Sequence, residues 1–140
     1  MKSLITLMTL TLSTATFACP EISGLYSCRS GSHVSEKEIT KTDLGYHIVS
    51  DGIEFTYMTD GNTYDVEAND SVKDGKVKSY CKDNKLIVDF KATILYEGAE
   101  IARQTSITEY VPAKENLIIT TKTKMKGLPM PVLKLNCTRL

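Results

Sequence analysis

The sequence contains no tryptophan, only three phenylalanines and only two histidines among its 140 residues. Its 17 basic and 17 acidic residues balance, and such a balance gives no electrostatic footprint for nucleic acid or for an anionic membrane surface. Helical periodicity, internal repeats and low-complexity linkers are all absent. Threonine, valine, isoleucine and tyrosine are common instead, and these residues favour strands. The sequence therefore predicts an all-β domain.

Long hydrophobic runs are missing as well, except near the first residue. Lys2, the apolar run 4–12 and the small-x-small sequence Thr16-Phe17-Ala18 are typical of a secretory signal peptide. The run is shorter than the roughly twenty residues needed to cross a bilayer, so no transmembrane segment is expected. Removing residues 1–18 leaves 16 basic against 17 acidic residues, a net charge of −1. We expect one domain over residues 19–140, secreted or periplasmic.

The first residue of that mature chain leaves a second possibility open. Acylated bacterial lipoproteins also begin with a cysteine after their signal sequence. Of the residues before Cys19 only Ala18 fits that pattern well, because leucine is usual three places before the cysteine. Cleavage without lipid is the main expectation, and anchoring through Cys19 is the alternative.

The four cysteines all lie in residues 19–140. An even number of cysteines in an exported chain predicts two disulfides. No two of them have the two-residue spacing of a zinc knuckle, so the sequence predicts neither a metal site nor another cofactor.

The strongest local signal is a hairpin. Strand-like segments 46–50 and 53–58 flank Asp51-Gly52, a dipeptide suited to a two-residue turn. The longest expected strand, 85–96, alternates apolar and polar residues, which indicates one buried and one wet face. The proline-rich segment 128–131 is expected to lie outside any regular ladder, because two backbone donors are missing.

Tight turns divide the chain into eight to ten expected strands, which form an antiparallel up-and-down meander. A meander protects its edges most simply by closing into a barrel, and a two-sheet β-sandwich is the alternative.

Candidates for catalysis are weak. Ser32, His33 and Glu36 fall in one short polar stretch without a nucleophile elbow, so a solvated loop explains them better than a hydrolase site. His47 lies in the middle of an expected strand. We therefore expect that the protein is not an enzyme.

A basic row, Lys122, Lys124 and Lys126, lies on one face of an expected strand. It could contact an anionic partner, but a solvated strand face is the favoured interpretation.

Gly24-Leu25-Tyr26 at the start of the first strand, together with Arg139 near the carboxyl end, is similar to the pattern of lipocalins and the wider calycin group. In that family a Gly-x-Trp closes the barrel floor, and the tryptophan stacks under a basic residue of the last strand. Gly24 and Arg139 match, whereas Tyr26 stands where tryptophan is usual. The resemblance implies a lipocalin-like barrel that these three residues close and that encloses a small apolar ligand.

The same barrel gives a register. If Tyr26 faces Arg139 across antiparallel first and last strands, paired residue numbers sum to 165 and Cys28 lies opposite Cys137. Cys19 then pairs with Cys81. The rival pairing is Cys19 with Cys28 and Cys81 with Cys137, because the shorter loop closes more readily.

A barrel of about eight strands is either filled by its own side chains or wide enough for one small ligand. In the first case the protein is an exported inhibitor or interaction module that uses its surface, with a partner that the sequence does not identify. In the second it is an exported binder of a small hydrophobic ligand, with no role for nucleic acid. The expected pocket lining is then Phe55, Tyr57, Val88, Phe90, Ile94, Thr121, Thr123 and Met125.

Overall fold

The computed structural model describes residues 19–140, which contain strands and no helix. The predicted signal peptide, residues 1–18, lies outside the described residues. The strands are β1 (Gly24–Ser30), β2 (His33–Lys41), β3 (Gly45–Ser50), β4 (Ile53–Met58), β5 (Thr63–Val66), β6 (Val72–Lys82), β7 (Lys85–Tyr96), β8 (Ala99–Ala113), β9 (Asn116–Met125), β10 (Leu128–Pro129) and β11 (Leu133–Arg139).

One antiparallel sheet contains every described strand, in the order β4-β3-β2-β1-β11-β9-β8-β7-β6-β5, with β10 added beside β9. Neighbours in the sheet are mostly neighbours in the sequence, so the predicted all-β meander is confirmed. The exception is the ladder between β1 and β11, which joins the two ends of the described chain. The described residues form eleven strands where eight to ten were expected, because Leu128 and Pro129 form the additional short strand β10.

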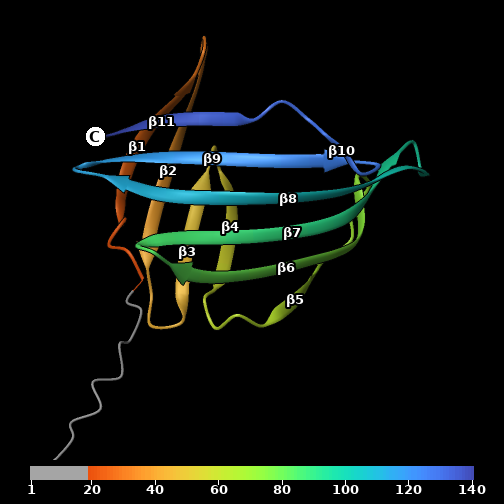
Figure 1. Cartoon of the computed structure of the whole chain (residues 1–140), viewed down its shortest axis with the longest axis horizontal. Helices are drawn as coiled ribbons and strands as arrows, with labels where there is room; N and C mark the ends of the chain where they lie inside the picture. Colours follow the sequence, from red (N-terminus) through yellow and green to blue (C-terminus); the bar gives the residue numbers. More distant parts are fainter. Residues whose placement is uncertain (1–18) are drawn as a thin grey trace, which may run out of the picture.

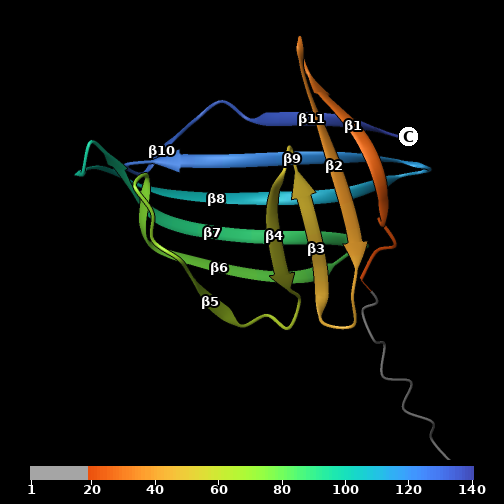
Figure 2. The same cartoon turned by 180° about the vertical axis from the view of Figure 1, so that it is seen from behind.

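The sheet curls over on itself into two layers (Figure 1). Strands β1 to β4 form one layer and run across β6 to β9 and β11 of the other, as the reverse view also shows (Figure 2). The expected closed barrel is a half-barrel instead, because no ladder joins β4 to β5 in residues 19–140. Gly61, in the link between these strands, donates its backbone N–H to Ser79 O of β6 at 3.2 Å. The link therefore bonds to β6, and an open seam remains beside β4.

The expected Asp51-Gly52 hairpin is confirmed: both residues have positive φ, 49° and 82°, between β3 and β4. The expectation for 128–131 is wrong, since Leu128 and Pro129 form β10 and pair with β9. A two-residue turn precedes β10, which puts Leu128 opposite Met125 in a hydrogen-bonded pair and Pro129 in the next, non-bonded pair. The missing N–H of Pro129 therefore faces the free edge of β10, where no ladder needs it.

The core lies at one end of the half-barrel, which is covered by residues 19–23, the N-terminal segment. Tyr26 and Tyr46 are fully buried there. Their hydroxyls donate to backbone oxygens of that segment, Tyr26 to Ile22 O at 3.0 Å and Tyr46 to Pro20 O at 2.6 Å. Apolar side chains of both layers pack around them, namely Ile22, Ile39, Ile48, Leu86, Val88, Tyr110, Leu117 and Ile119.

Two disulfides fix this end of the molecule. Cys28 bonds to Cys137, and Cys19 bonds to Cys81, as expected from the register argument. Tyr26 indeed lies opposite Arg139. The sulfur of Cys19, the atom that a lipoprotein acylates, is occupied by the bond to Cys81, which removes the attachment point for the lipid-anchored alternative. Two disulfides are typical of an oxidising, extracellular-type environment.

We expect the double variant Cys28→Ser/Cys137→Ser to lower the free energy of unfolding by about 2 to 5 kcal/mol, because the bond restrains the unfolded chain across a separation of 109 residues. Urea unfolding without reductant measures the loss. A non-reduced digest of the parent protein supplies the control, since it must contain the Cys28–Cys137 peptide. An unchanged unfolding midpoint in the variant would contradict this role for the bridge.

Candidate functional site

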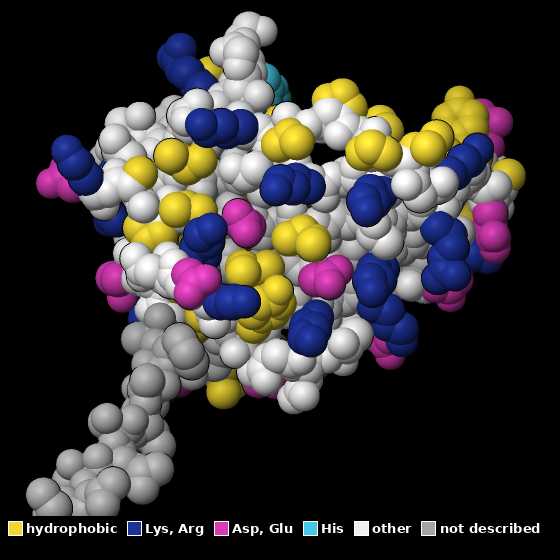
Figure 3. All heavy atoms as spheres, viewed as in Figure 1, with side chains coloured by type: hydrophobic (Ala, Val, Ile, Leu, Met, Phe, Trp, Pro, Cys, Tyr) yellow, Lys and Arg dark blue, Asp and Glu magenta, His cyan; other side chains and the backbone are white. Residues whose placement is uncertain are grey.

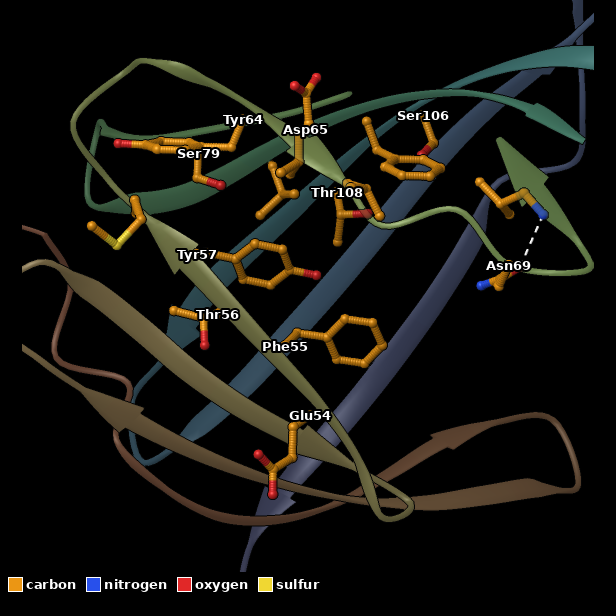
Figure 4. A pocket seen from close by; sticks show the side chains of 16 residues that line it. Glu54, Phe55, Thr56, Tyr57, Tyr64, Asp65, Asn69, Ser79, Ser106 and Thr108 are labelled. Carbon is orange, nitrogen blue, oxygen red and sulfur yellow. Dashed lines mark hydrogen bonds between the residues drawn. The ribbon is translucent and has the colours of Figure 1, made fainter. Parts of the chain in front are cut away.

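A cavity of about 650 Å³ lies along the open seam, between β4 on one side and β5 to β8 on the other (Figure 4). It occupies the part of the half-barrel away from the packed core. Its lining comprises Glu54, Phe55, Thr56, Tyr57, Met58, Tyr64, Asp65, Val66, Asn69, Val72, Val77, Ser79, Val88, Phe90, Ser106 and Thr108.

One wall of the cavity is aromatic. Phe55 and Tyr57 are two residues apart on β4, so both side chains face the interior. Their rings are nearly parallel, with an interplanar angle of 8° and centroids 6.2 Å apart. Phe55 is 41% exposed although it points inward, because the strand that would cover it across the seam is missing. The pair therefore offers an uncovered apolar surface to a ligand.

The opposite wall mixes apolar and hydroxyl side chains. The ladders between β6, β7 and β8 place Ser79, Val88 and Thr108 in one row across the sheet. Val77, Phe90 and Ser106 form the next row, closer to the open end. These rows put hydroxyl groups among apolar surfaces, an arrangement that holds an apolar molecule and hydrogen-bonds one polar group of it.

A pair of tyrosines lies where the cavity meets the core. Burial raises the pKa of the Tyr110 hydroxyl, and a side-chain hydrogen bond with Tyr57 raises it further. Burial also raises the pKa of Tyr57. Both hydroxyls therefore stay protonated near neutral pH, and they serve as hydrogen-bonding groups rather than as acids or bases.

The charged groups of the lining are both carboxylates. Glu54 and Asp65 lie at the rim and point away from the interior, because they alternate with the inward-facing Phe55 and Tyr64, and no lysine, arginine or histidine belongs to the lining. Asp65 forms an ion pair with Lys76, and Glu54 lies 3.4 Å from Nε2 of His47. The cavity thus lacks a cation that could neutralise a carboxylate or phosphate ligand. Within residues 19–140 no cluster of histidine, cysteine and acidic side chains is arranged to hold a metal ion.

Half of the expected lining residues lie in the cavity. Phe55, Tyr57, Val88 and Phe90 line it, whereas Ile94, Thr121, Thr123 and Met125 do not. The two threonines also face inward, but β8 separates β9 from the seam, and Thr121 reaches only Thr108, with 3.0 Å between their Oγ1 atoms.

Ile94 and Met125 lie beyond the cavity, opposite Ala102 and Gln104 of β8. The prediction missed the contribution of β5 and β6, including Tyr64, Val66 and Val77. The shared face of Tyr64 and Val66 is the sequence signal that could identify the β5 side.

The residues expected to close the barrel do meet at the other end. The Arg139 guanidinium carbon lies 5.2 Å from the centre of the Tyr26 ring, and Nη2 donates to the Tyr26 hydroxyl at 2.9 Å. The same side chain donates to Ser23 O at 2.7 Å and to Glu115 O at 3.1 Å. A Cβ on Gly24 would lie 2.6 Å from Nη1, so glycine leaves the space that the guanidinium occupies. This cluster ties together the N-terminal segment, β11 and the turn before β9.

The residues considered for catalysis remain apart from the cavity. His33 and Glu36 are on β2, whose hairpin with β1 extends away from the seam (Figure 1). Among the hydrogen bonds of the described residues, none links Ser32 to His33, and the Glu36 backbone N–H donates to Asp51.

Comparisons of the chain with protein-family models, with curated proteins and with solved structures found no match. In residues 19–140 there is no helix of the length and apolar character that crossing a bilayer requires.

We expect Arg139→Lys to lower the free energy of unfolding by about 1 to 3 kcal/mol, since one ammonium group cannot replace a stacked guanidinium with three oxygen partners. Gly24→Ala should cause a similar loss by displacing the guanidinium, and the double variant should lose less than the sum. Urea unfolding measures all three. Arg103→Lys, which alters an exposed arginine, is the matched control. Equal midpoints for Arg139→Lys and this control would show that the cluster contributes nothing.

The buried tyrosines also predict a loss of stability at high pH. Burial raises the pKa of Tyr46 to about 12, against about 10 in an unfolded chain. Because the folded value is the higher one, this stabilisation is complete below about pH 10 and disappears as the pH rises towards 12. Urea midpoints measured from about pH 8 to about pH 11 should therefore fall, and fall less in Tyr46→Phe. A parallel decline in both proteins would exclude Tyr46 as a cause.

Proposed function

We propose that the protein is an exported binding protein that holds one small, mainly apolar and uncharged molecule in the seam cavity. The observation that carries this proposal is the aromatic surface of Phe55 and Tyr57, which faces a cavity that no side chain of the described residues fills. The role that we propose is binding, because the lining combines an aromatic surface with a few hydroxyl groups that can hydrogen-bond one molecule.

The size of the cavity supports a ligand of modest size. Pockets for small molecules typically measure about 300 to 1,000 Å³, and a volume of about 650 Å³ lies in the middle of that range. The open seam provides an entry path, since β4 and β5 are not bonded to each other.

The charges of the lining support an uncharged ligand. A fatty acid or another anion would bring its charge into an apolar interior whose lining has no cation to compensate it. An alcohol, amide or ester could instead hydrogen-bond to Ser79, Ser106 or Thr108. This preference separates the proposal from a general affinity for lipids.

Export is supported by the two disulfides and by the signal-like residues 1–18. The lipocalin-like identity implied by the resemblance remains part of this proposal, supported by the contact between Arg139 and Tyr26. The alternative, a ligand-free interaction module, requires that the cavity stay empty in solution.

The test compares two ligands of equal chain length, a long-chain alcohol and the corresponding carboxylate, by competition with an environment-sensitive apolar dye. We expect the alcohol to displace the dye and the carboxylate to bind at least about tenfold more weakly, because an uncompensated buried charge costs more than 1.4 kcal/mol. Phe55→Ala should weaken dye binding by about tenfold, as its ring supplies much of the apolar contact.

Leu25→Ala is the matched control, because Leu25 is 44% exposed, like Phe55, but lies outside the cavity. The affinity of this variant for the dye should equal that of the parent protein. If neither dye nor alcohol binds and no lipid can be extracted from the purified protein, the interaction module replaces the binding protein.

A further inference from the structure

The outer face of the large layer carries a group of exposed cations. Lys122 and Lys124 alternate along β9 and Lys126 begins the turn that follows it, while Arg103 on β8 and Lys91 on β7 occupy the same face as the two β9 lysines. Lys124 is opposite Thr105, which is opposite Lys91, and the Lys126 N–H donates to Arg103 O. We call these five residues the cationic grid. Figure 3 shows lysine and arginine side chains gathered over this layer.

The grid has little internal neutralisation. The ion pairs of the described residues involve Lys41, His47, Lys73, Lys76 and Lys85, none of which belongs to the grid. The ladders place two carboxylates on the same face, Asp89 opposite Ile107 and Glu109 opposite Thr120, and Glu109 forms an ion pair with Lys85. The grid therefore retains an excess of positive charge that is available to a partner.

Exposed apolar side chains border the grid on two sides. On β8, Ile101 and Ile107 lie on the same outer face and are each 47% exposed. Beyond β9, the segment 128–133 folds back along the strand: Leu128 and Met130 lie opposite Met125 and Thr123 on the inner face, whereas Val132, 57% exposed, lies on the outer face. Solvation alone does not explain so many exposed aliphatic side chains around one group of cations.

We propose that this surface docks the protein onto an anionic lipid bilayer. The cations contact lipid phosphates, and the side chains of Ile101, Ile107 and Val132 enter the boundary between headgroups and acyl chains. Both parts are needed at a membrane surface, where binding depends on buried apolar area together with attraction to anionic lipid.

Two observations favour a bilayer over a soluble polyanion. A nucleic acid or a polysaccharide would use the cations but would leave Ile101, Ile107 and Val132 in water. The grid also lies on the outer side of a broad sheet rather than in a groove that could follow one strand of a polymer (Figure 1). A single extended surface of charge and aliphatic side chains matches an extended lipid surface.

The balanced net charge of the chain hides this surface, because residues 19–62 contain seven acidic and three basic residues whereas residues 63–140 contain ten acidic and thirteen basic ones. Glu36, Glu38, Asp51 and Glu54 belong to β2, β4 and the turn before β4, in the other layer. The molecule is therefore charge-polarised, and an anionic membrane attracts one layer while repelling the other. The net charge alone predicts no attraction to an anionic membrane, but the uneven distribution of charge gives the molecule one face that such a membrane attracts.

The experiment is flotation of the purified, disulfide-bonded protein with vesicles of phosphatidylcholine, alone or mixed with phosphatidylglycerol. We expect binding to the mixed vesicles only, and we expect added salt to weaken it. Lys122→Gln/Lys124→Gln/Lys126→Gln should weaken binding by about a hundredfold, since each lysine near such a surface contributes about fivefold. Ile107→Ser/Val132→Ser should also weaken it, without removing its dependence on salt.

The matched control is Arg29→Gln/Lys82→Gln/Lys114→Gln, which removes the same charge from exposed positions outside the grid and should bind like the parent. Equal loss in both triple variants would overturn the grid as the site, leaving only a net-charge effect. Equal binding to pure phosphatidylcholine would overturn the electrostatic part, and binding to heparin but not to vesicles would overturn the bilayer. Dye binding in the cavity is measured on the same variants and should not change, so failure here is distinguishable from failure of the proposed ligand site.

Discussion

The ladder between β1 and β11 is the constraint on which the rest of the structure depends. It joins segments more than a hundred residues apart, and the bond between Cys28 and Cys137 makes one of its contacts covalent. Arg139 adds hydrogen bonds to the N-terminal segment, so the same two strands are held at a second point. Without this ladder, β1 to β4 and β5 to β11 would be two separate sheets, each with an additional exposed edge.

Closure on this side explains why the molecule can remain open on the other. The disulfides, the arginine cluster and the buried tyrosines all lie around one end, where the two layers are in contact and the core is dense. The seam between β4 and β5 has no such restraint, and β5 has only four residues with which to form a ladder. An edge strand that carries Phe55 and Tyr57 therefore borders a cavity, whereas a closed barrel would have packed these rings against a neighbouring strand.

Local patterns in the sequence predicted the features that are decided locally. Asp51-Gly52 gave the hairpin, and the alternation in β7 gave its buried face. One long-range feature was also accessible, because the match of Tyr26 with Arg139 set the register that pairs the cysteines. The open seam could not be predicted from the sequence, because no residue pattern in β4 or β5 indicates that these two strands fail to pair. Thr121 and Thr123 were therefore placed with the right face but in the wrong part of the interior, and Pro129 was excluded from a ladder whose free edge tolerates it.

The two proposed surfaces have opposite electrostatic requirements, and this opposition keeps them from competing for the same molecule. The cationic grid attracts lipid phosphates on an open sheet face, whereas the cavity is a recess along the seam whose lining has no cation. An anionic lipid held at the grid therefore gains nothing by entering the cavity, while an uncharged apolar molecule dissolved in the same membrane meets no such penalty. Docking would then depend strongly on salt and on lipid charge, and occupancy of the cavity on neither, because screening acts on exposed charges and not on apolar contact. A protein that combines both surfaces can approach a membrane through its charged lipids and still select an uncharged molecule from it.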